Sequence, residues 1–305
     1  MTTLVFGHKS PDTDSTGSPI IWAWYLNEIG IPAKPVLLGE PNTEAAFVLK
    51  HWGLDKPAII QDVTADDKVV IVDTNNPAEL PPSVNEAKIQ AIIDHHMLVG
   101  GIKTKTPIDI TIRPLACTAT IMHDLMGDTL AQAPKGIKGA MLSCILSDTL
   151  EFRSPTTTPH DRAVAEKLAA DLRVSIPELA TKMFEAKSDV SAFSDAELLR
   201  MDSKEYNVEG KELRVSVLET TAPKIVLDRK ASLMRAMEGV AKEDGADQVL
   251  LFVVDILKEE ATLLVPNDLV KQLAEASFGA KVTGDTVVLP GIMSRKKQII
   301  PALKL

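Results

Sequence analysis

The chain of 305 residues has little cysteine and no long apolar run. Its two cysteines, Cys117 and Cys144, exclude a disulfide-stapled scaffold and leave too few ligands for a thiolate zinc site. No segment approaches the roughly 18 consecutive apolar residues that cross a membrane, and residues 1–8 lack the cationic start and apolar core of a signal peptide. We therefore expect a cytoplasmic protein without a membrane partner.

Positive charge and aromatic side chains are also scarce. The 33 Lys and Arg residues are outnumbered by 42 Asp and Glu residues, which gives a net charge of -9. This balance disfavours binding of nucleic acid by bulk electrostatic attraction, and an aromatic content of 4% leaves few platforms on which bases could stack. We expect no nucleic-acid partner. The length and the 45% hydrophobic content favour two domains.

Short β-branched runs alternate with helix-spaced apolar patterns in the first half of the chain. This alternation predicts an α/β fold with an N-terminal, doubly wound and mainly parallel sheet. The predicted strands cover residues 3–6, 35–38, 68–72 and 89–93. The predicted helices cover residues 20–29, 43–52, 116–126, 137–147, 159–172 and 176–187.

A short polar stretch at residues 188–194 precedes a second pattern of strands and helices. We therefore predict a first domain at residues 1–187, a hinge linker at 188–194 and a smaller C-terminal α/β domain at 195–305. Its expected strands cover residues 213–218, 249–255, 261–265 and 286–289, and its expected helices cover 230–243 and 269–278.

Acids and histidines directly follow the apolar segments of the first half. Three predicted strands and one predicted helix lead into such residues: His8 with Asp12 and Asp14, Asp73, Asp94 to His96, and Asp148. Because the carboxyl ends of parallel strands line one crevice, where ligands bind, we expect these side chains to meet there.

Taken singly, an aspartate after a strand is more often a helix cap or a turn residue, and in the first loop we expect Ser15 or Thr16 to cap the following helix. Together, the candidate ligands are too many for one tetrahedral metal site, and their number suits two divalent ions. The six predicted ligands are His8, Asp12, Asp14, Asp73, His95 and Asp148. Carboxylates and imidazoles without thiolates favour manganese, with cobalt as a substitute and iron as a further alternative. Two such ions, bridged by Asp73, would lower the pKa of a shared water and clamp the oxygens of an in-line displacement.

A basic segment, Arg295-Lys296-Lys297, lies between apolar residues near the end of the chain, and Lys204 follows a helix expected at residues 198–203. A run of charged residues is usually a solvated surface. In a chain of net charge -9, however, the planar guanidinium group of the arginine and the ammonium groups of the lysines are suited to bind phosphate oxygens. An acidic metal site together with a cationic site predicts a phosphate ester or anhydride as substrate.

These motifs resemble those of the family II, manganese-dependent inorganic pyrophosphatases of the DHH phosphoesterase superfamily. The resemblance covers nearly the whole chain and rests on residues 7–15, 72–75, 94–96, 147–149 and 294–298. It implies a DHH domain followed by a DHHA2-like domain, with the active site in the cleft between them. It also implies a homodimer formed through the first domain.

The resemblance further implies the role of each site residue. His8, Asp12 and Asp73 would hold one Mn²⁺, and Asp14, Asp73, His95 and Asp148 would hold the other. His96, Lys204, Arg295 and Lys296 would contact pyrophosphate, which arrives with Mg²⁺. The implied reaction is hydrolysis of pyrophosphate to two orthophosphates by a hydroxide between the two ions. Its catalytic residues would be Asp73, His96, Lys204, Arg295 and Lys296.

Two alternative functions fit the sequence less well. DHH phosphoesterases that cleave short oligonucleotides, cyclic dinucleotides or nucleotide bisphosphates usually carry a glycine-rich segment with a histidine in the second domain, and no such segment follows residue 160 here. A regulatory nucleotide binder on an inactive version of the fold would need a long insertion. The intervals from Asp73 to Asp94 and from His96 to Asp148 leave no room for one.

We expect Lys296→Ala to reduce turnover of pyrophosphate far more than it weakens Mn²⁺ binding, because the lysine is expected to contact the substrate and not the metal. Steady-state phosphate release, measured beside Mn²⁺ affinity on the same preparation, checks this expectation. An unchanged turnover would remove Lys296 from the site.

Overall fold

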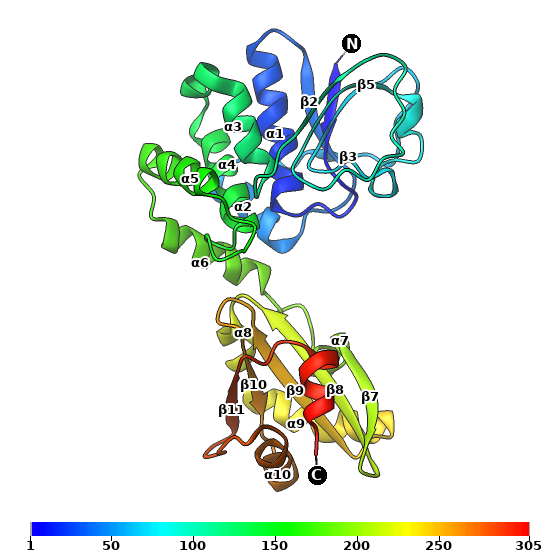
Figure 1. Cartoon of the computed structure of the whole chain (residues 1–305), viewed down its shortest axis with the longest axis vertical. Helices are drawn as coiled ribbons and strands as arrows, with labels where there is room; N and C mark the ends of the chain where they lie inside the picture. The colour runs from blue at the N-terminus through cyan, green and yellow to red at the C-terminus, as the bar shows by residue number, and fades with distance from the viewer. Residues whose placement is uncertain (1, 305) are drawn as a thin grey trace. The chain divides into compact units, whose positions relative to one another are not determined.

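The structure, a computed structural model, describes residues 2–304 and divides into two compact units (Figure 1). Unit 1 ends at Lys187 and unit 2 begins at Ser188. The residues expected as a linker, 188–194, pack with unit 2: the Thr220 hydroxyl donates to Ser188 Oγ at 2.7 Å, and Val190 belongs to a core cluster of that unit.

Unit 1 is built on six parallel strands in the order β3-β2-β1-β4-β5-β6. The strands are β1 (Thr3–Phe6), β2 (Ala33–Leu37), β3 (Ala58–Ile59), β4 (Lys68–Val72), β5 (Lys88–Asp94) and β6 (Asp109–Ile112). The predicted parallel sheet is confirmed. The strand order reverses between β1 and β4, and such a switch point opens a crevice for ligands at the carboxyl ends of the strands.

Helices cover one face of this sheet, and α1, α3 and α4 lie side by side there (Figure 1). The helices are α1 (Thr13–Glu28), α2 (Thr43–Trp52), α3 (Thr118–Met126), α4 (Lys135–Asp148), α5 (Pro159–Leu172) and α6 (Ile176–Lys187). Apolar side chains of strands and helices form the main core between them. Loops and two short 3-10 turns, at Pro77–Glu79 and Val84–Glu86, pack over the opposite face.

Helix α1 begins seven residues before the start expected from the sequence. Asp12 is its N-cap, and its Oδ1 accepts a hydrogen bond from the Ser15 backbone N–H at 2.9 Å. The expected cap at Ser15 or Thr16 is therefore wrong, because both residues lie inside the first turn. The first turns are buried small and polar residues, so they lack the apolar periodicity that marks a surface helix.

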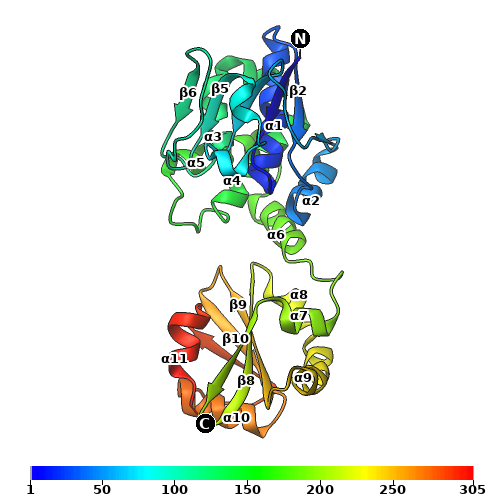
Figure 2. The same ribbon diagram turned by 90° about the vertical axis from the view of Figure 1, so that its right-hand side faces the viewer.

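Unit 2 contains a five-stranded sheet in the order β11-β10-β9-β8-β7, in which β8 and β9 are parallel and the other neighbours antiparallel (Figure 2). The strands are β7 (Ser203–Val208), β8 (Lys211–Thr220), β9 (Gln248–Asp255), β10 (Glu260–Leu264) and β11 (Thr286–Pro290). The helices are α7 (Asp195–Met201), α8 (Pro223–Leu227), α9 (Lys230–Asp244), α10 (Asp268–Phe278) and α11 (Ile300–Ala302). The smaller C-terminal α/β fold is confirmed.

The helix expected at residues 198–203 is displaced in the structure. A capping box at Ser194 starts α7 earlier, and Ser203 already pairs with Ser216 in the β7–β8 hairpin. Lys204 consequently lies on a strand. No described helix combines the length and apolar character needed to span a bilayer.

Candidate metal centre and anion pocket

All six predicted metal ligands lie at the carboxyl ends of the unit 1 strands or at the ends of α1 and α4 that adjoin them. Potential ligand atoms form three groups, and within each group the atoms lie within 4.8 Å of one another. The groups are His8 with Asp12 and Asp73, Asp73 with His95 and His96, and Asp14 with Cys117 and Asp148. The first two groups share Asp73. The structure thus places every predicted ligand in one of these groups, but Asp14 and Asp148 group with the buried thiol of Cys117 and not with Asp73 and His95. His96, which was not predicted as a ligand, joins Asp73 and His95.

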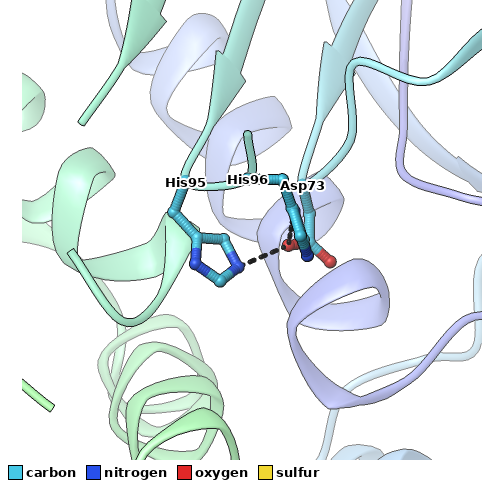
Figure 3. Close-up of side chains that lie close together, drawn as sticks. All are labelled: Asp73, His95 and His96. Atoms are coloured by element: carbon cyan, nitrogen blue, oxygen red, sulfur yellow. Dashed lines mark ion pairs between the residues drawn. The ribbon is translucent and has the colours of Figure 1, made fainter. Parts of the chain in front are cut away.

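Asp73 presents a different carboxylate oxygen to each of two histidines. Its Oδ2 lies 3.6 Å from His8 Nε2. Its Oδ1 lies 3.3 Å from His95 Nε2 (Figure 3). The backbone of Asp73 is left-handed, with a φ of 58°, a conformation that costs a non-glycine residue about 1–3 kcal/mol. Such strain at the end of a buried strand is typical of a residue held for function.

The ring of His95 is oriented by the backbone of a distant segment. Its Nδ1 lies 3.2 Å from the Leu115 carbonyl oxygen, which can only accept, so Nδ1 carries the proton. Burial lowers the pKa of His95, which favours the neutral ring with a lone pair on Nε2. A lone pair facing a carboxylate oxygen of Asp73 places two acceptors together, an arrangement that suits a cation bound to both.

The carboxylates repel one another strongly. Burial raises the pKa of Asp73 well above its ordinary value, and the charges of Asp14 and Asp12 raise it further. Burial and the same two neighbours likewise raise the pKa of Asp148. In addition, the buried Oδ2 of Asp148 has no hydrogen-bond partner in the described part of the chain. Crowded, incompletely satisfied carboxylates beside imidazole rings fit divalent cations.

Several residues that hold the ligands were not identified from the sequence. Asp14 accepts hydrogen bonds from the Thr118 backbone N–H at 2.7 Å and from the Ser18 hydroxyl at 2.6 Å. The Thr118 hydroxyl also donates to Asp73 Oδ1 at 3.2 Å. Thr118 begins α3, far from both acids in sequence, so no local motif could have indicated it.

The first loop folds tightly against the start of α1. The backbone N–H of His8 donates to Ser15 Oγ at 2.7 Å. A Cβ atom at Gly7 would lie 1.9 Å from that oxygen, so the close approach requires glycine at position 7. This packing sets the position of His8 relative to Asp12, whose Oδ2 lies 3.8 Å from His8 Nε2.

Asp94 organises the histidine pair instead of joining the ligand cluster. Its Oδ1 lies 2.9 Å from His96 Nδ1 and accepts from the His95 backbone N–H, while its Oδ2 accepts from the Asn75 amide at 2.6 Å. Burial acts to raise the pKa of Asp94, but the hydrogen bonds from His96 and Asn75 lower it overall. In turn, the hydrogen bond to Asp94 raises the pKa of His96, whose ring is half exposed.

Unit 2 gathers the three predicted anion-binding residues in one pocket. Lys204 on β7 and Arg295 and Lys296 at the start of a π-helical turn (Arg295–Ile299) line a cavity of about 640 Å³. Gln298 orders that turn, because its side-chain oxygen accepts from the backbone N–H groups of Met293 and Ser294 at 2.9 Å each.

Asp202, which lines the same cavity, holds Arg295. Its carboxylate accepts from Arg295 Nη2, and its backbone carbonyl accepts from Nη1, both at 2.7 Å. The guanidinium is therefore fixed in orientation. Asp202 was not identified from the sequence, because an aspartate after a short helix carries no signal of its own.

Comparison with known proteins assigns the family. The DHH family N-terminal domain matches residues 2–148, and the DHHA2 domain matches residues 181–305. A probable manganese-dependent inorganic pyrophosphatase of Lactobacillus helveticus is 34% identical over 302 residues, covering 98% of this chain and 97% of the relative. The chain belongs to the manganese-dependent inorganic pyrophosphatase family. A second member, from Deinococcus radiodurans, is 39% identical over 306 residues, covering 98% of this chain and 97% of the relative.

Solved structures agree with this family. The crystal structure of a putative family II inorganic pyrophosphatase from Methanococcus jannaschii is 34% identical, with a TM-score of 0.61, and covers 99% of this chain and 98% of that one. An exopolyphosphatase-related protein from Bacteroides fragilis shares the fold, with a TM-score of 0.52 at 13% identity, and covers 98% of this chain and 89% of that one. The resemblance seen in the sequence motifs is therefore confirmed.

In the metal-free protein, we expect Asp148→Asn to raise the free energy of unfolding at pH 7 by about 1–4 kcal/mol, because it removes one crowded, buried charge. The gain should shrink as the pH falls. The pKa values of Asp73 and Asp148 are raised in the folded protein. The unmodified protein therefore loses stability as the pH rises through these values, and it regains that stability at lower pH, where both groups take up protons. The variant should also lose the stabilisation that added Mn²⁺ gives the unmodified chain.

Urea unfolding of the metal-stripped protein at pH 5 and pH 7, with and without Mn²⁺, measures these effects. Asp55→Asn serves as the control, because Asp55 is exposed and its substitution should change stability by less than about 0.5 kcal/mol. Equal stability of the Asp148→Asn and unmodified proteins at pH 7 would contradict the repulsion between carboxylates.

Proposed function

We propose that this chain hydrolyses inorganic pyrophosphate to two orthophosphates. The observation that carries the proposal is the presence, in one chain of this family, of a carboxylate and imidazole cluster in unit 1 and a pocket of three cations in unit 2. The cluster suits divalent cations, and the pocket suits the oxygens of a compact, highly charged anion. Pyrophosphate requires both.

Manganese is the proposed metal, at two ions per chain. His8, Asp12 and Asp73 would hold one ion, and Asp14, Asp73, His95 and Asp148 would hold the other, so that Asp73 is shared. When bound, the ions would lower the pKa of a water molecule and withdraw charge from the phosphoryl oxygens. Carboxylates and imidazoles also bind Co²⁺, which we propose as a substitute, and Mg²⁺ would enter with the substrate.

His96 is the proposed proton donor to the departing phosphate. Its Nδ1 is held by Asp94 at 2.9 Å, which orients the ring and favours the protonated form. The protonated ring keeps a second proton on Nε2, which is free to pass to a phosphate oxygen. The hydrogen bond to Asp94 thus provides an acid whose pKa is raised above its ordinary value.

Lys204, Arg295 and Lys296 are proposed to bind pyrophosphate and to neutralise the charge that develops on it. The planar fork of Arg295 can bind two phosphate oxygens at once, and Asp202 keeps that fork in one orientation before substrate binds. The two lysines add point charges on the same cavity. Cations preset in this way stabilise a transition state without reorganising.

The proposal assigns metal binding to residues 1–187 and substrate binding to residues 195–305. Both groups of residues would act on the same pyrophosphate molecule.

We expect metal-stripped protein to release phosphate from pyrophosphate after reconstitution, with the fastest release in Mn²⁺ or Co²⁺ and slower release in Zn²⁺ or Mg²⁺. A short single-stranded oligonucleotide and a nucleotide bisphosphate, tested under the same conditions, should not be cleaved. Cleavage of either compound without cleavage of pyrophosphate would leave the metal site in place and overturn the substrate assignment.

We also propose a cytoplasmic homodimer formed through unit 1. Strand β6 lies at an edge of the sheet, and its Ile110 side chain is 56% exposed. Beside it lies a groove of about 720 Å³ lined largely by apolar side chains, including Trp22, Tyr25 and Leu125. An open edge strand beside an apolar groove is a surface that proteins usually cover.

We expect Ile110→Lys to convert the dimer to a monomer, because it places a charge on the edge that would pair with a second copy. Sedimentation velocity measures the change in mass. Val288→Lys is the matched control, since Val288 is similarly exposed (49%) on the edge strand β11 of unit 2 and should leave the mass unchanged. A dimer that survives Ile110→Lys would exclude this edge as the interface.

A further inference from the structure

Glu44 is a buried carboxylate to which the proposed reaction assigns no role. It lies in the first turn of α2, where an acid is expected near the helix N-terminus, but its side chain is 0% exposed. A glutamate is almost never fully buried unless other groups compensate its charge. The groups around Glu44 therefore indicate what it does.

Two hydroxyl groups share one oxygen of Glu44. The Thr13 hydroxyl donates to Oε2 at 2.9 Å, and the Ser147 hydroxyl donates to the same atom at 2.7 Å. Thr13 lies between the proposed ligands Asp12 and Asp14, and Ser147 directly precedes Asp148. One oxygen atom of α2 thus connects the start of α1 to the end of α4.

A positive charge completes the surroundings of Glu44. Lys187 Nζ lies 3.5 Å from Oε2, and Lys187 is the last residue of α6 and of unit 1. Helix α2 packs against α1, α4 and α6, so the carboxylate lies where these helices meet (Figure 1). The other oxygen, Oε1, is buried without a hydrogen-bond partner in the described range 2–304.

We propose that Glu44 is a positioning residue for the metal centre. The charges of Asp14 and Asp12 act on Asp148 and would push the end of α4 away from the first loop. The hydrogen bonds of Thr13 and Ser147 to a common acceptor hold the two segments at a fixed separation against that repulsion. The proposal rests on the proposed function only in taking Asp12, Asp14 and Asp148 as metal ligands.

A purely structural role for Glu44 predicts a different result. If Glu44 only joined three helices, its loss would lower the stability of unit 1 but leave the metal affinity of the folded protein unchanged. If it positions the ligands, its loss weakens metal binding itself, and residues that orient metal ligands typically change affinity 10–100-fold. Metal affinity therefore separates the two roles.

The experiment measures Mn²⁺ affinity of the folded full-length protein from the electron paramagnetic resonance signal of free Mn²⁺. Glu44→Ala removes the shared acceptor and should raise the dissociation constant about 10–100-fold. Glu44→Gln keeps an acceptor oxygen for both hydroxyls, so affinity should stay within about threefold of the unmodified chain. Glu185→Ala, an exposed glutamate on α6, is the control and should leave affinity unchanged.

A double-mutant comparison tests the route through the hydroxyls. Ser147→Ala and Thr13→Val should each weaken Mn²⁺ binding, and Ser147→Ala should add little to Glu44→Ala, because both remove the same hydrogen bond. If Glu44→Ala does not fold, these two hydroxyl variants decide the matter. Unchanged Mn²⁺ affinity in them, or in folded Glu44→Ala, would overturn the proposal.

The outcome is independent of the substrate. A chain that binds Mn²⁺ but releases no phosphate from pyrophosphate would contradict the proposed function, and the Mn²⁺ affinities of the Glu44 variants would still support or overturn the positioning role.

Discussion

Electrostatic repulsion among four buried or partly buried aspartates is the constraint around which unit 1 is arranged. Asp12, Asp14, Asp73 and Asp148 come from three elements, and burial together with their mutual charge raises the pKa values of Asp73 and Asp148. Hydrogen bonds from backbone N–H groups and hydroxyls hold individual acids, and bonds to charged groups contribute about 1.5–3 kcal/mol each. None of these donors carries a net charge, and burial favours the neutral form of His95. The repulsion is therefore relieved when the acids take up protons or when cations bind, and at neutral pH it leaves unfavourable electrostatic energy in the apo centre.

The surrounding residues keep the ligands in place while that energy is uncompensated. Asp73 is held in a strained, left-handed conformation, and Thr118 binds both Asp73 and Asp14. Asp94 takes no part in the cluster and instead fixes the orientation and proton of His96. In unit 2 the functional side chain is a cation instead of an acid, and it too is held by a polar partner, since Asp202 accepts a hydrogen bond from Arg295 in the anion pocket. In both units, a polar partner fixes the functional side chain before any ligand arrives, which reduces the cost of ordering it on binding.

The clustering of the candidate ligands could be predicted from the sequence, whereas the residues that hold them in place could not. His8, Asp73 and His95 each follow a short apolar run, and the rule that parallel strands end at one edge of a sheet brings such residues together. The bounds of α2, α5 and α6 match the prediction because each has a clear apolar stripe and a recognisable start or end. Thr118 and Asp14 are 104 residues apart, and Glu44 and Ser147 are 103 apart, so their hydrogen bonds leave no local pattern. The edge strands β3 and β6 are short and largely exposed, which removes the apolar signal of a buried strand.

The most direct test of this account is the number and mutual coupling of Mn²⁺ ions bound by the metal-stripped chain. Titration with Mn²⁺ followed by electron paramagnetic resonance counts the ions and distinguishes isolated ions from a magnetically coupled pair. The account predicts two ions per chain and the spectrum of a coupled pair, because Asp73 offers one carboxylate oxygen to each of two histidine-bearing sites. A single ion per chain, or two ions without coupling, would contradict a shared centre built around Asp73.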